Sequence, residues 1–405
     1  MTTVATVEGP VSDLDPFSDA FVVDPFPELV GLRAMGPAVH LSRYDAWAVA
    51  AHAEVHALLR DHRRFSSAAG VGLGDLRTAA YGWRKPSLLL EVDPPDHARY
   101  RGVVVGAMTP RALRVFEEDF AVEARRIVDD LVGRGSFDAV TDLAEVFPTV
   151  VFPRALGVQG DVREPLLAYG ALSFNAIGPR NQRLEASLVA CEGVLEWITD
   201  HCRREALREG SIGAGIHDAA TAAGLSDDHA ASLVRSLFSA GVDTTVSALS
   251  FAVLDFLHHP EQWDLVRNDP ELARSAFEET VRFESPVIGF FRTTTEEVRL
   301  GDARIPADAK VLALYAGANR DPAHWPDPDR YDVQRRTAGH LGYGVGPHVC
   351  AGMSLARLEG QVVISALAER IAGWEPAGEV VPRLNNALRS LTSLPVRVAP
   401  RDSAR

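Results

Sequence analysis

Cysteine is scarce in this chain of 405 residues, which has only Cys191, Cys202 and Cys350. The three form no Cys-x-x-Cys pair, and an odd number cannot be resolved into a complete set of disulfides. A disulfide-stapled secreted fold is therefore excluded as the leading interpretation, and a cysteine-ligated zinc site is disfavoured. We expect a protein of a reducing, cytoplasmic compartment.

Long apolar runs and an excess of positive charge are also missing. No stretch of 18 or more apolar residues is present to span a bilayer, and residues 1–10 lack the basic start and apolar centre of a secretory signal. The net charge is −14, with 41 Lys and Arg against 55 Asp and Glu, whereas a general nucleic-acid binder needs a basic face. The sequence thus predicts a protein that binds neither membrane nor nucleic acid.

The chain is 46% hydrophobic and 24% charged, which is the composition of a globular protein with a substantial core. No internal repeat or low-complexity linker marks a boundary, so we expect a single domain over 1–405. Residues 1–30 are rich in Pro, Asp and Phe and predict an irregular arm, whereas helical patterns dominate 110–290. Strands are expected at 39–49, 298–305 and 311–315. The fold class is mainly α with a smaller β-rich portion.

Residues 340–352 form a glycine-rich stretch, with glycines at 342, 344, 346 and 352. Glycine permits close backbone approaches that side chains block, as needed against a large flat group. His348 and Cys350 alternate, so they point the same way in an extended stretch. A predicted helix over 353–371 puts Cys350 at a helix N-terminus, which favours an anion and lowers a thiol pKa. Cys350 is a candidate thiolate ligand or nucleophile, and a buried structural cysteine is the alternative.

One long helix is expected between an N-cap at Ser226 and Pro260. Its roughly 34 residues would span about 50 Å, enough to cross a whole domain. One face of the helical wheel is small and polar, with Thr244 at its edge. The residues on that face are Ser236, Ser239, Ala240, Asp243 and Ser247. Such a face indicates a cavity or ligand, and the alternative is hydroxyls that bond back to helix carbonyls.

The stretch 340–352 resembles the haem-thiolate signature of the cytochrome P450 family, Phe-Gly-x-Gly-x-His-x-Cys-x-Gly, with Tyr343 where Phe is usual. The resemblance implies the P450 fold, haem b as cofactor and Cys350 as its axial thiolate ligand. Residues 240–245 resemble the family signature Ala/Gly-Gly-x-Asp/Glu-Thr-Thr. By that resemblance Thr244 holds water and hydrogen-bonds dioxygen, and Asp243 relays protons from solvent, which implies a monooxygenase.

Two further motifs match the same family. Glu279 and Arg282 resemble its Glu-x-x-Arg motif, which pairs with a later loop arginine matched by Arg330 and implies a brace for the Cys350 loop. Without the resemblance, Glu279 and Arg282 would be a solvated surface pair. The two haem propionates need cations and donors. The positions that match the family's propionate contacts are His97, Arg101, Arg292 and His348.

Residues that suit a carboxylate precede the helix that starts near His97. Arg84 and Ser87 offer a charge and a hydroxyl, although an exposed basic residue is the alternative for Arg84. The set resembles the bacterial subgroup that oxidises para-substituted benzoic acids, in which the carboxylate is held at one end and the para substituent points at iron. The implied substrate-binding residues are Arg84, Ser87, Phe174, Ser236, Ser239, Ala240, Val287 and Phe290.

The resemblance also implies partners. Electrons would come from an iron–sulfur ferredoxin and its NAD(P)H-dependent reductase, steered by Arg99, Arg101, Arg111 and Arg114. The leading hypothesis is a monooxygenase that hydroxylates or O-demethylates a small aromatic carboxylic acid such as 4-methoxybenzoate. Two alternatives stay open: a P450 of a biosynthetic pathway acting on a larger substrate, and a non-catalytic haem sensor.

Overall fold

The computed structural model describes residues 7–78, 85–160 and 162–401. Helices dominate this part of the chain, in agreement with the sequence pattern. The α-helices are α1 Asp19–Val23, α2 Phe26–Met35, α3 His52–Arg60, α4 Asp96–Ala107, α5 Pro110–Arg134, α6 Val146–Leu156, α7 Arg163–Asn175, α8 Gln182–Ala190, α9 Val194–His201, α10 Ile212–Ala222, α11 Asp227–Gly241, α12 Asp243–His258, α13 Pro260–Asn268, α14 Ala273–Glu284, α15 Tyr315–Asn319 and α16 Met353–Arg370.

The strands form one larger sheet and three small ones. They are β1 Val11–Ser12, β2 Val39–Leu41, β3 Ala46–Val49, β4 Phe65–Ser66, β5 Ser136–Asp138, β6 Gly289–Thr294, β7 Val298–Leu300, β8 Ala303–Ile305, β9 Lys310–Leu314, β10 Ile371–Pro376, β11 Val381–Arg383, β12 Ser390–Ser393 and β13 Pro395–Pro400. The larger sheet has the order β1-β2-β3-β9-β6-β4, and β10-β13-β5 form a second. The pairs β7–β8 and β11–β12 are hairpins.

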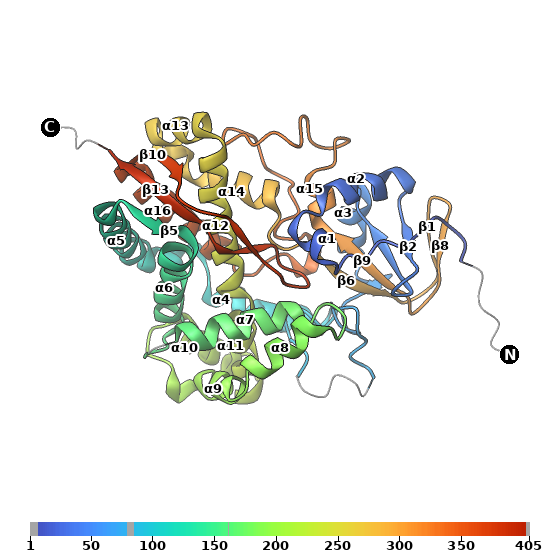
Figure 1. The fold of residues 1–405 in the computed structure, drawn as a ribbon. Helices are drawn as coiled ribbons and strands as arrows, with labels where there is room; N and C mark the ends of the chain where they lie inside the picture. Colours follow the sequence, from blue (N-terminus) through green and yellow to red (C-terminus); the bar gives the residue numbers. More distant parts are fainter. Residues whose placement is uncertain (1–6, 79–84, 161, 402–405) are drawn as a thin grey trace.

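The larger sheet is packed on both faces. Along β9, Val311 and Ala313 join one apolar cluster, whereas Leu312 and Leu314 join another, because successive side chains of a strand point to opposite faces. In Figure 1 this sheet and the N-terminal helices α1 to α3 occupy one side of the molecule, and α5, α6 and α13 lie on the other. Helix α12 runs through the middle, and α16 packs against α5 and α14.

The expected long helix is present but interrupted. Ser226 caps α11, as the sequence predicts, and its hydroxyl accepts the His229 N–H. Val242 then separates α11 from α12. At the break, a Cβ on Gly241 would come within 2.3 Å of the Phe152 ring, so only glycine fits there. The prediction of one uninterrupted helix is therefore wrong. One residue, Val242, interrupts it within the small polar face.

Two other expectations are corrected by the structure. From residue 19 on, the expected irregular arm is wrong, because α1 and α2 bury Phe21 and Leu29 against the larger sheet. Residues 298–305 are not one strand but the hairpin β7–β8, which turns at Gly301 with a φ of +57°. Glycine adopts that left-handed conformation without the strain that a side chain brings.

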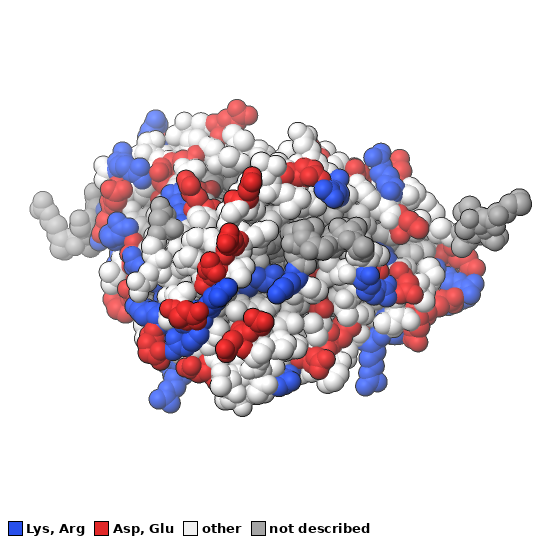
Figure 2. Space-filling view, turned by 90° about the horizontal axis from the view of Figure 1, so that it is seen from below, with Lys and Arg blue, Asp and Glu red and all other residues white. Residues whose placement is uncertain are grey.

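Within the described residues, Asp227–His258 is the one helical segment long and apolar enough to cross a membrane, judged by length and composition alone. Because 72% of its most apolar window is buried inside the protein, it fits a core helix. Figure 2 shows the face of the molecule on which α8, α9 and α10 lie, where basic side chains are interspersed with acidic ones.

Candidate haem and substrate site

The loop that carries Cys350 is a tight turn that needs its glycines. Gly344 and Gly346 have φ angles of +67° and +80°, and a Cβ on Gly346 would lie 2.6 Å from the Leu59 carbonyl oxygen. The Cys350 N–H donates to the Tyr343 carbonyl at 2.8 Å and closes the turn. Helix α16 begins three residues later. The turn therefore holds the thiol in place before the helix starts.

The Cys350 side chain is exposed to a cavity of about 200 Å³, which we call the lower cavity. A second space of about 320 Å³, the upper cavity, adjoins it. The residues that line both are Val71, Leu90, Phe174, Ser236, Ala240 and Phe290. The two are therefore neighbours, and these six residues form the wall that they share. Cys191 and Cys202 are buried and take no part in the lower cavity.

Burial raises the pKa of the Cys350 thiol above its ordinary value. The backbone N–H of Gly352 and the Arg101 guanidinium act in the opposite direction but do not outweigh burial. The N–H groups at the helix N-terminus, those of Gly352 and Met353, lower this pKa as expected, but burial outweighs them in the protein groups alone. A metal cation at the sulfur would reverse the balance, because coordination deprotonates a thiol.

His97 and His348 lie side by side with ring centroids 4.1 Å apart. In each ring the buried Nε2 has no hydrogen-bond partner among the described residues. Burial lowers the pKa of both, with Arg101 adding to the effect at His97 and Arg292 at His348, whose pKa falls to about 3. Arg101, Arg292 and His348 line the lower cavity.

Unpartnered buried nitrogens beside two arginines need anions. Haem b carries two propionates of that kind. Arg101, Arg292 and His348 line the lower cavity, and His97 packs against His348. A thiol faces the same cavity. The residues present therefore fit haem b, with these four groups toward the propionates and Cys350 toward the iron.

Asp243 and Thr244 are adjacent at the helix break but face different surroundings. Thr244 lines the lower cavity, and its Oγ1 donates to the Ala240 carbonyl at 2.7 Å. Asp243 is 1% exposed and accepts from Arg383 of β11 at 2.6 Å. Burial raises the pKa of Asp243, and Arg383 opposes that rise. Because the Arg383 side chain is 22% exposed, it connects Asp243 to the surface.

Only part of the small polar face predicted for this helix lines a cavity. Ser236, Ser239 and Ala240 line the upper cavity, but neither Asp243 nor Ser247 lines either one. Ser247 is fully buried and donates to the Asp243 carbonyl at 2.8 Å, as the back-bonding alternative predicts. The expectation of one continuous polar face on the cavity is therefore wrong beyond Ala240, because Asp243 turns to Arg383 and Ser247 is buried against the helix backbone.

The other residues predicted to bind substrate that the structure describes also reach this space. Ser87 lines the upper cavity, with its Oγ 3.1 Å from the Ser236 Oγ. Phe174 and Phe290 line both cavities, and Val287 lines the lower one. Hydroxyls thus line the upper cavity from Ser87, Ser236 and Ser239 and the lower one from Ser236, Thr244 and Thr245.

Arg235 lies in the upper cavity wall and was missed by sequence reasoning. Its guanidinium donates to the carbonyls of Lys85 and Pro86, each at 3.2 Å, and Lys85 lines the same cavity. The sequence signal for Arg235 is its position directly before Ser236, which on a helix points about 100° away. Arg84 lies outside the described residues.

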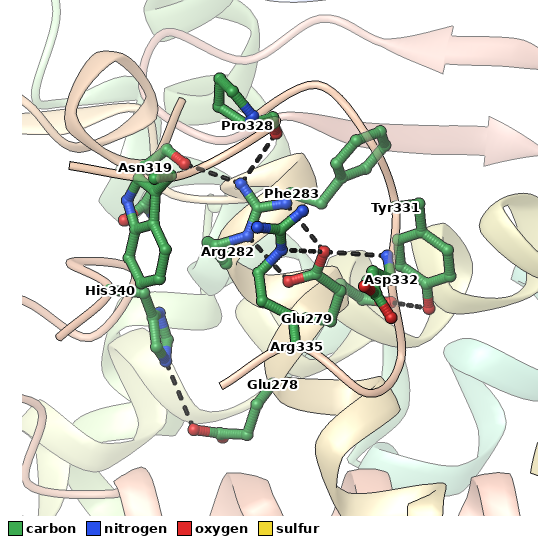
Figure 3. A network of polar contacts seen from close by, with 12 residues as sticks. Glu278, Glu279, Arg282, Phe283, Asn319, Pro328, Tyr331, Asp332, Arg335 and His340 are labelled. Carbon is green, nitrogen blue, oxygen red and sulfur yellow. Dashed lines mark hydrogen bonds and ion pairs between the residues drawn. The ribbon is translucent and has the colours of Figure 1, made fainter. Parts of the chain in front are cut away.

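Behind the Cys350 loop, Glu279 and Arg282 form an ion pair with no exposed side-chain surface (Figure 3). Arg282 donates to both carboxylate oxygens, at 2.7 and 2.8 Å. It also donates to the carbonyls of Asn319 and Pro328. The solvated-pair alternative is therefore wrong, because this pair is a buried brace between α14 and the loops after α15.

The loop arginine that completes this network is Arg335, so the expectation of Arg330 is wrong. Arg335 Nε donates to Glu279 at 3.1 Å, as Figure 3 shows. Arg330 contributes its backbone carbonyl to Arg282 and Arg335, whereas its own side chain is 64% exposed. Both arginines belong to the same loop, and a motif read in sequence does not tell which one turns inward.

Tyr343, which replaces the usual phenylalanine, has a partner for its hydroxyl. It donates to Glu278 at 3.1 Å, and the same carboxylate accepts from Arg357 at 2.9 and 2.6 Å and contacts His340. Burial acts to raise the pKa of Glu278, but the hydrogen bonds from His340 and Arg357 outweigh it and lower that pKa to about 2. Sequence reasoning missed Glu278, whose signal is an acid directly before the Glu-x-x-Arg motif.

Comparisons with known proteins agree with this geometry. The family model described as Cytochrome P450 matches residues 206–392. Cytochrome p450 CYP199A2 of Rhodopseudomonas palustris is 45% identical over 388 residues, covering 96% of this chain and 94% of that protein. Cytochrome P450 107B1 of Saccharopolyspora erythraea is 32% identical, covering 96% of this chain and 98% of that protein.

Solved structures match over the same length. The structure of epothilone D-bound cytochrome P450epoK has a TM-score of 0.83 at 29% identity and covers 96% of this chain and 100% of that one. Cytochrome P450 CYP109Q5 from Chondromyces apiculatus has a TM-score of 0.82 at 30% identity, with coverages of 96% and 99%. The chain therefore belongs to the cytochrome P450 family of monooxygenases, whose haem carries a cysteine thiolate as axial ligand.

Proposed function

We propose that this P450 hydroxylates or O-demethylates a small aromatic carboxylic acid such as 4-methoxybenzoate. The observation that carries the proposal is the combination of polar and apolar side chains that line the two adjoining cavities. Ser87 and Ser239 line the upper cavity and Ser236 lines both cavities, and Phe174 and Phe290 give both of them apolar walls. An aromatic acid whose carboxylate meets the hydroxyls would direct its para substituent into the lower cavity.

Charge at the polar end supports a carboxylate. Lys85 and Arg235 line the upper cavity together with the serines, and hydrogen bonds to an ionised group are the stronger kind. Two acids, Glu91 and Asp228, line it as well. The Glu91 carboxylate accepts the Ser87 N–H at 2.9 Å, so it also helps to hold the Ser87 backbone in place.

Cavity size favours a small substrate over a large one. The upper cavity of about 320 Å³, taken together with the adjoining lower cavity of about 200 Å³, still lies in the lower half of the roughly 300–1,000 Å³ usual for ligand pockets. The larger-substrate alternative draws on relatives such as the epothilone C/D epoxidase of Sorangium cellulosum, 31% identical over 412 residues. A macrocyclic substrate would require the walls around Phe174 and Phe290 to move apart.

The haem, when bound, supplies the activation of dioxygen and the insertion of one oxygen atom into a C–H bond. The chain's own residues do the rest. The serines would fix the carboxylate, and with both ends of the acid held one carbon is presented to the oxidant. Thr244 offers a hydroxyl in the cavity wall, and Asp243 with Arg383 would bring protons from the surface. A hydroxylated methoxy group then breaks down to a phenol and formaldehyde.

The electron donors belong to the same proposal: an iron–sulfur ferredoxin with an NAD(P)H-dependent ferredoxin reductase, in the cytoplasm. Of the four arginines expected to attract the ferredoxin, Arg111 and Arg114 are exposed near the start of α5. Arg101 lines the lower cavity instead. Arg99 donates to carbonyls of the loop between α10 and α11. Arg111 and Arg114 are therefore the better candidates for a docking contact.

The proposal is tested by titrating the purified holoprotein and following the haem Soret shift. We expect 4-methoxybenzoate to bind more tightly than 4-methoxytoluene, its neutral counterpart. Ser236→Ala should raise the Kd of the acid about tenfold or more, because a hydrogen bond to a charged group contributes about 1.5–3 kcal/mol. The same variant should leave the Kd of the neutral ether unchanged.

Ser247→Ala is the matched control, because Ser247 is a serine of the same helical segment that lines neither cavity. It should leave both Kd values unchanged. Equal binding of the acid and the ether, or equal effects of the two serine variants, would overturn the choice of an aromatic acid and leave the family assignment intact.

A further inference from the structure

Lysine is rare in this chain, which carries its positive charge almost entirely on arginine and has only two lysines, Lys85 and Lys310. Lys85 lines the upper cavity, whereas Lys310 begins β9 and has no part in the site described above. A buried lysine can lose its proton near neutral pH, and an arginine cannot. Lys310 therefore brings to its position a property that the many arginines lack.

The side chain of Lys310 holds the loop that follows β4. Its Nζ donates to the carbonyls of Ala69 and Gly70, each at 3.1 Å. The Ala69 carbonyl also accepts the Leu76 N–H at 3.0 Å. For the Gly70 carbonyl, Lys310 is the one donor in the part of the chain that the structure describes. Loss of this side chain would therefore leave a backbone acceptor without a partner, which is costly away from water.

The residue after Gly70 is Val71, which lines both cavities, and we call residues 67–76 the Val71 segment. The Val71 carbonyl accepts the Phe291 N–H of β6 at 2.9 Å. The Leu73 N–H donates to the Ile177 carbonyl, in the turn after α7, at 2.8 Å. The segment thus closes the space between β6 and that turn, and the two bonds from Lys310 hold it at the residues directly before Val71.

Burial lowers the pKa of Lys310 from its usual 10.5 to about 8. Charged groups of both signs surround it. Asp75 of the Val71 segment and Glu91 act to raise this pKa, whereas Arg77 and Arg292 of β6 act to lower it. Because these neighbours oppose one another, burial decides the result. Any movement of the segment that lets water reach the amine would therefore change how strongly it holds its proton.

We propose that Lys310 is a positioning residue that anchors the Val71 segment and so places Val71 in the wall that the two cavities share. The anchor is linked to a proton. When the segment detaches, the hydrated amine regains the ordinary lysine pKa, so the detached state binds the proton more strongly than the attached state. Raising the pH therefore stabilises attachment, and the neutral amine keeps two N–H groups, one for each carbonyl. The proposal is independent of which acid is the substrate.

The scarcity of lysine makes the titration of Lys310 directly readable by NMR. In haem-loaded protein labelled with ¹³C at the lysine Cε, and kept reduced under carbon monoxide, two lysine signals are present. The one that is missing from Lys310→Arg belongs to Lys310. We expect it to titrate with a midpoint near pH 8. A midpoint at the ordinary lysine pKa of 10.5 would overturn the proposal, because it would show a hydrated ammonium that holds nothing.

Hydrogen exchange of the Val71 segment tests the linkage to a proton. After correction for the intrinsic pH dependence of exchange, the protection of residues 67–76 in the wild-type holoprotein should rise about tenfold between pH 7 and pH 9, as linkage requires for a pKa of about 8 in the attached state and 10.5 in the detached one. Lys310→Arg stays charged over this range and should show no rise. A wild type without the rise, or an arginine variant with it, would overturn the linkage.

Lys310→Met tests the anchor itself at pH 9, where the wild-type amine is mostly neutral and the two side chains differ mainly in their N–H donors. Protection of the segment should fall about tenfold, as for the loss of two neutral hydrogen bonds. The haem Soret shift with 4-phenylimidazole, which binds iron directly, should give a Kd about fivefold higher, because the ligand loses contact with the methyl groups of Val71.

Arg299→Met is the matched control, because it also removes one cation, at an exposed position on β7 that lines neither cavity. It should leave protection and Kd at their wild-type values. Wild-type protection or a wild-type Kd in Lys310→Met would overturn the positioning role. A failed titration with aromatic acids would bear only on the proposed substrate, because neither hydrogen exchange nor phenylimidazole binding uses one.

Discussion

Replacing Glu279 with glutamine is expected to lower the free energy of unfolding by about 3–5 kcal/mol. Neither Glu279 nor Arg282 has exposed side-chain surface, so the substitution leaves the Arg282 and Arg335 guanidinium groups buried without their counter-charge. The network braces the loops before Cys350, and we expect the variant to retain little haem. Urea unfolding followed by tryptophan fluorescence, together with the Soret absorbance after purification, measures both effects.

The matched pair Arg335→Ala and Arg330→Ala tests which loop arginine completes this network. The Arg335 side chain is 9% exposed and donates to Glu279, so its loss should lower the unfolding free energy by about 1.5–3 kcal/mol. The Arg330 side chain is 64% exposed, and its removal should stay within about 0.5 kcal/mol. Equal losses from the two variants would contradict the assignment of Arg335.

Replacing Thr244 with alanine is expected to lower product formation about 10²-fold while NADH consumption continues. Thr244 lines the lower cavity, as Thr245 does, and its hydroxyl donates to the Ala240 carbonyl, which leaves its lone pairs free to accept. Without that hydroxyl, reduced oxygen should leave as hydrogen peroxide. Product and peroxide formed per NADH, measured together, give the partition.

Thr244→Ser is the control for this prediction, because serine keeps the hydroxyl and loses only a methyl group. It should restore most of the product yield. If the alanine variant kept wild-type coupling, the Thr244 hydroxyl would have no part in oxygen reduction. If both variants lost coupling equally, the methyl group and not the hydroxyl would be what matters at this position.

Local spacing predicts the thiol loop and the mainly helical fold well, because their physical causes are local. The glycines around Cys350 set a turn that needs left-handed φ angles at Gly344 and Gly346, and Ser226 starts α11 as an N-cap. The sequence did not show why glycine is needed at the helix break, because the reason is the approach of Phe152 to Gly241. That contact joins residues far apart in the chain.

The misassigned site residues have the same kind of cause. Ser247 is fully buried and bonds to the helix backbone instead of lining a cavity. Arg335 rather than Arg330 turns inward because the loop folds back on α14. Glu278 and Arg235 occupy positions next to motif residues, where sequence alone gives no reason to select them. Contacts between distant segments of the chain decide which of two adjacent residues faces the site.

The most direct test of the central claim is the absorption spectrum of the reduced haem-loaded protein under carbon monoxide. The claim is that the Cys350 thiolate binds the haem iron from the side of the glycine turn. We predict the red-shifted Soret band of a thiolate-ligated haem in wild type and its loss in Cys350→Ser. A wild-type protein that binds haem without that band, or a Cys350→Ser variant that keeps it, would contradict the account.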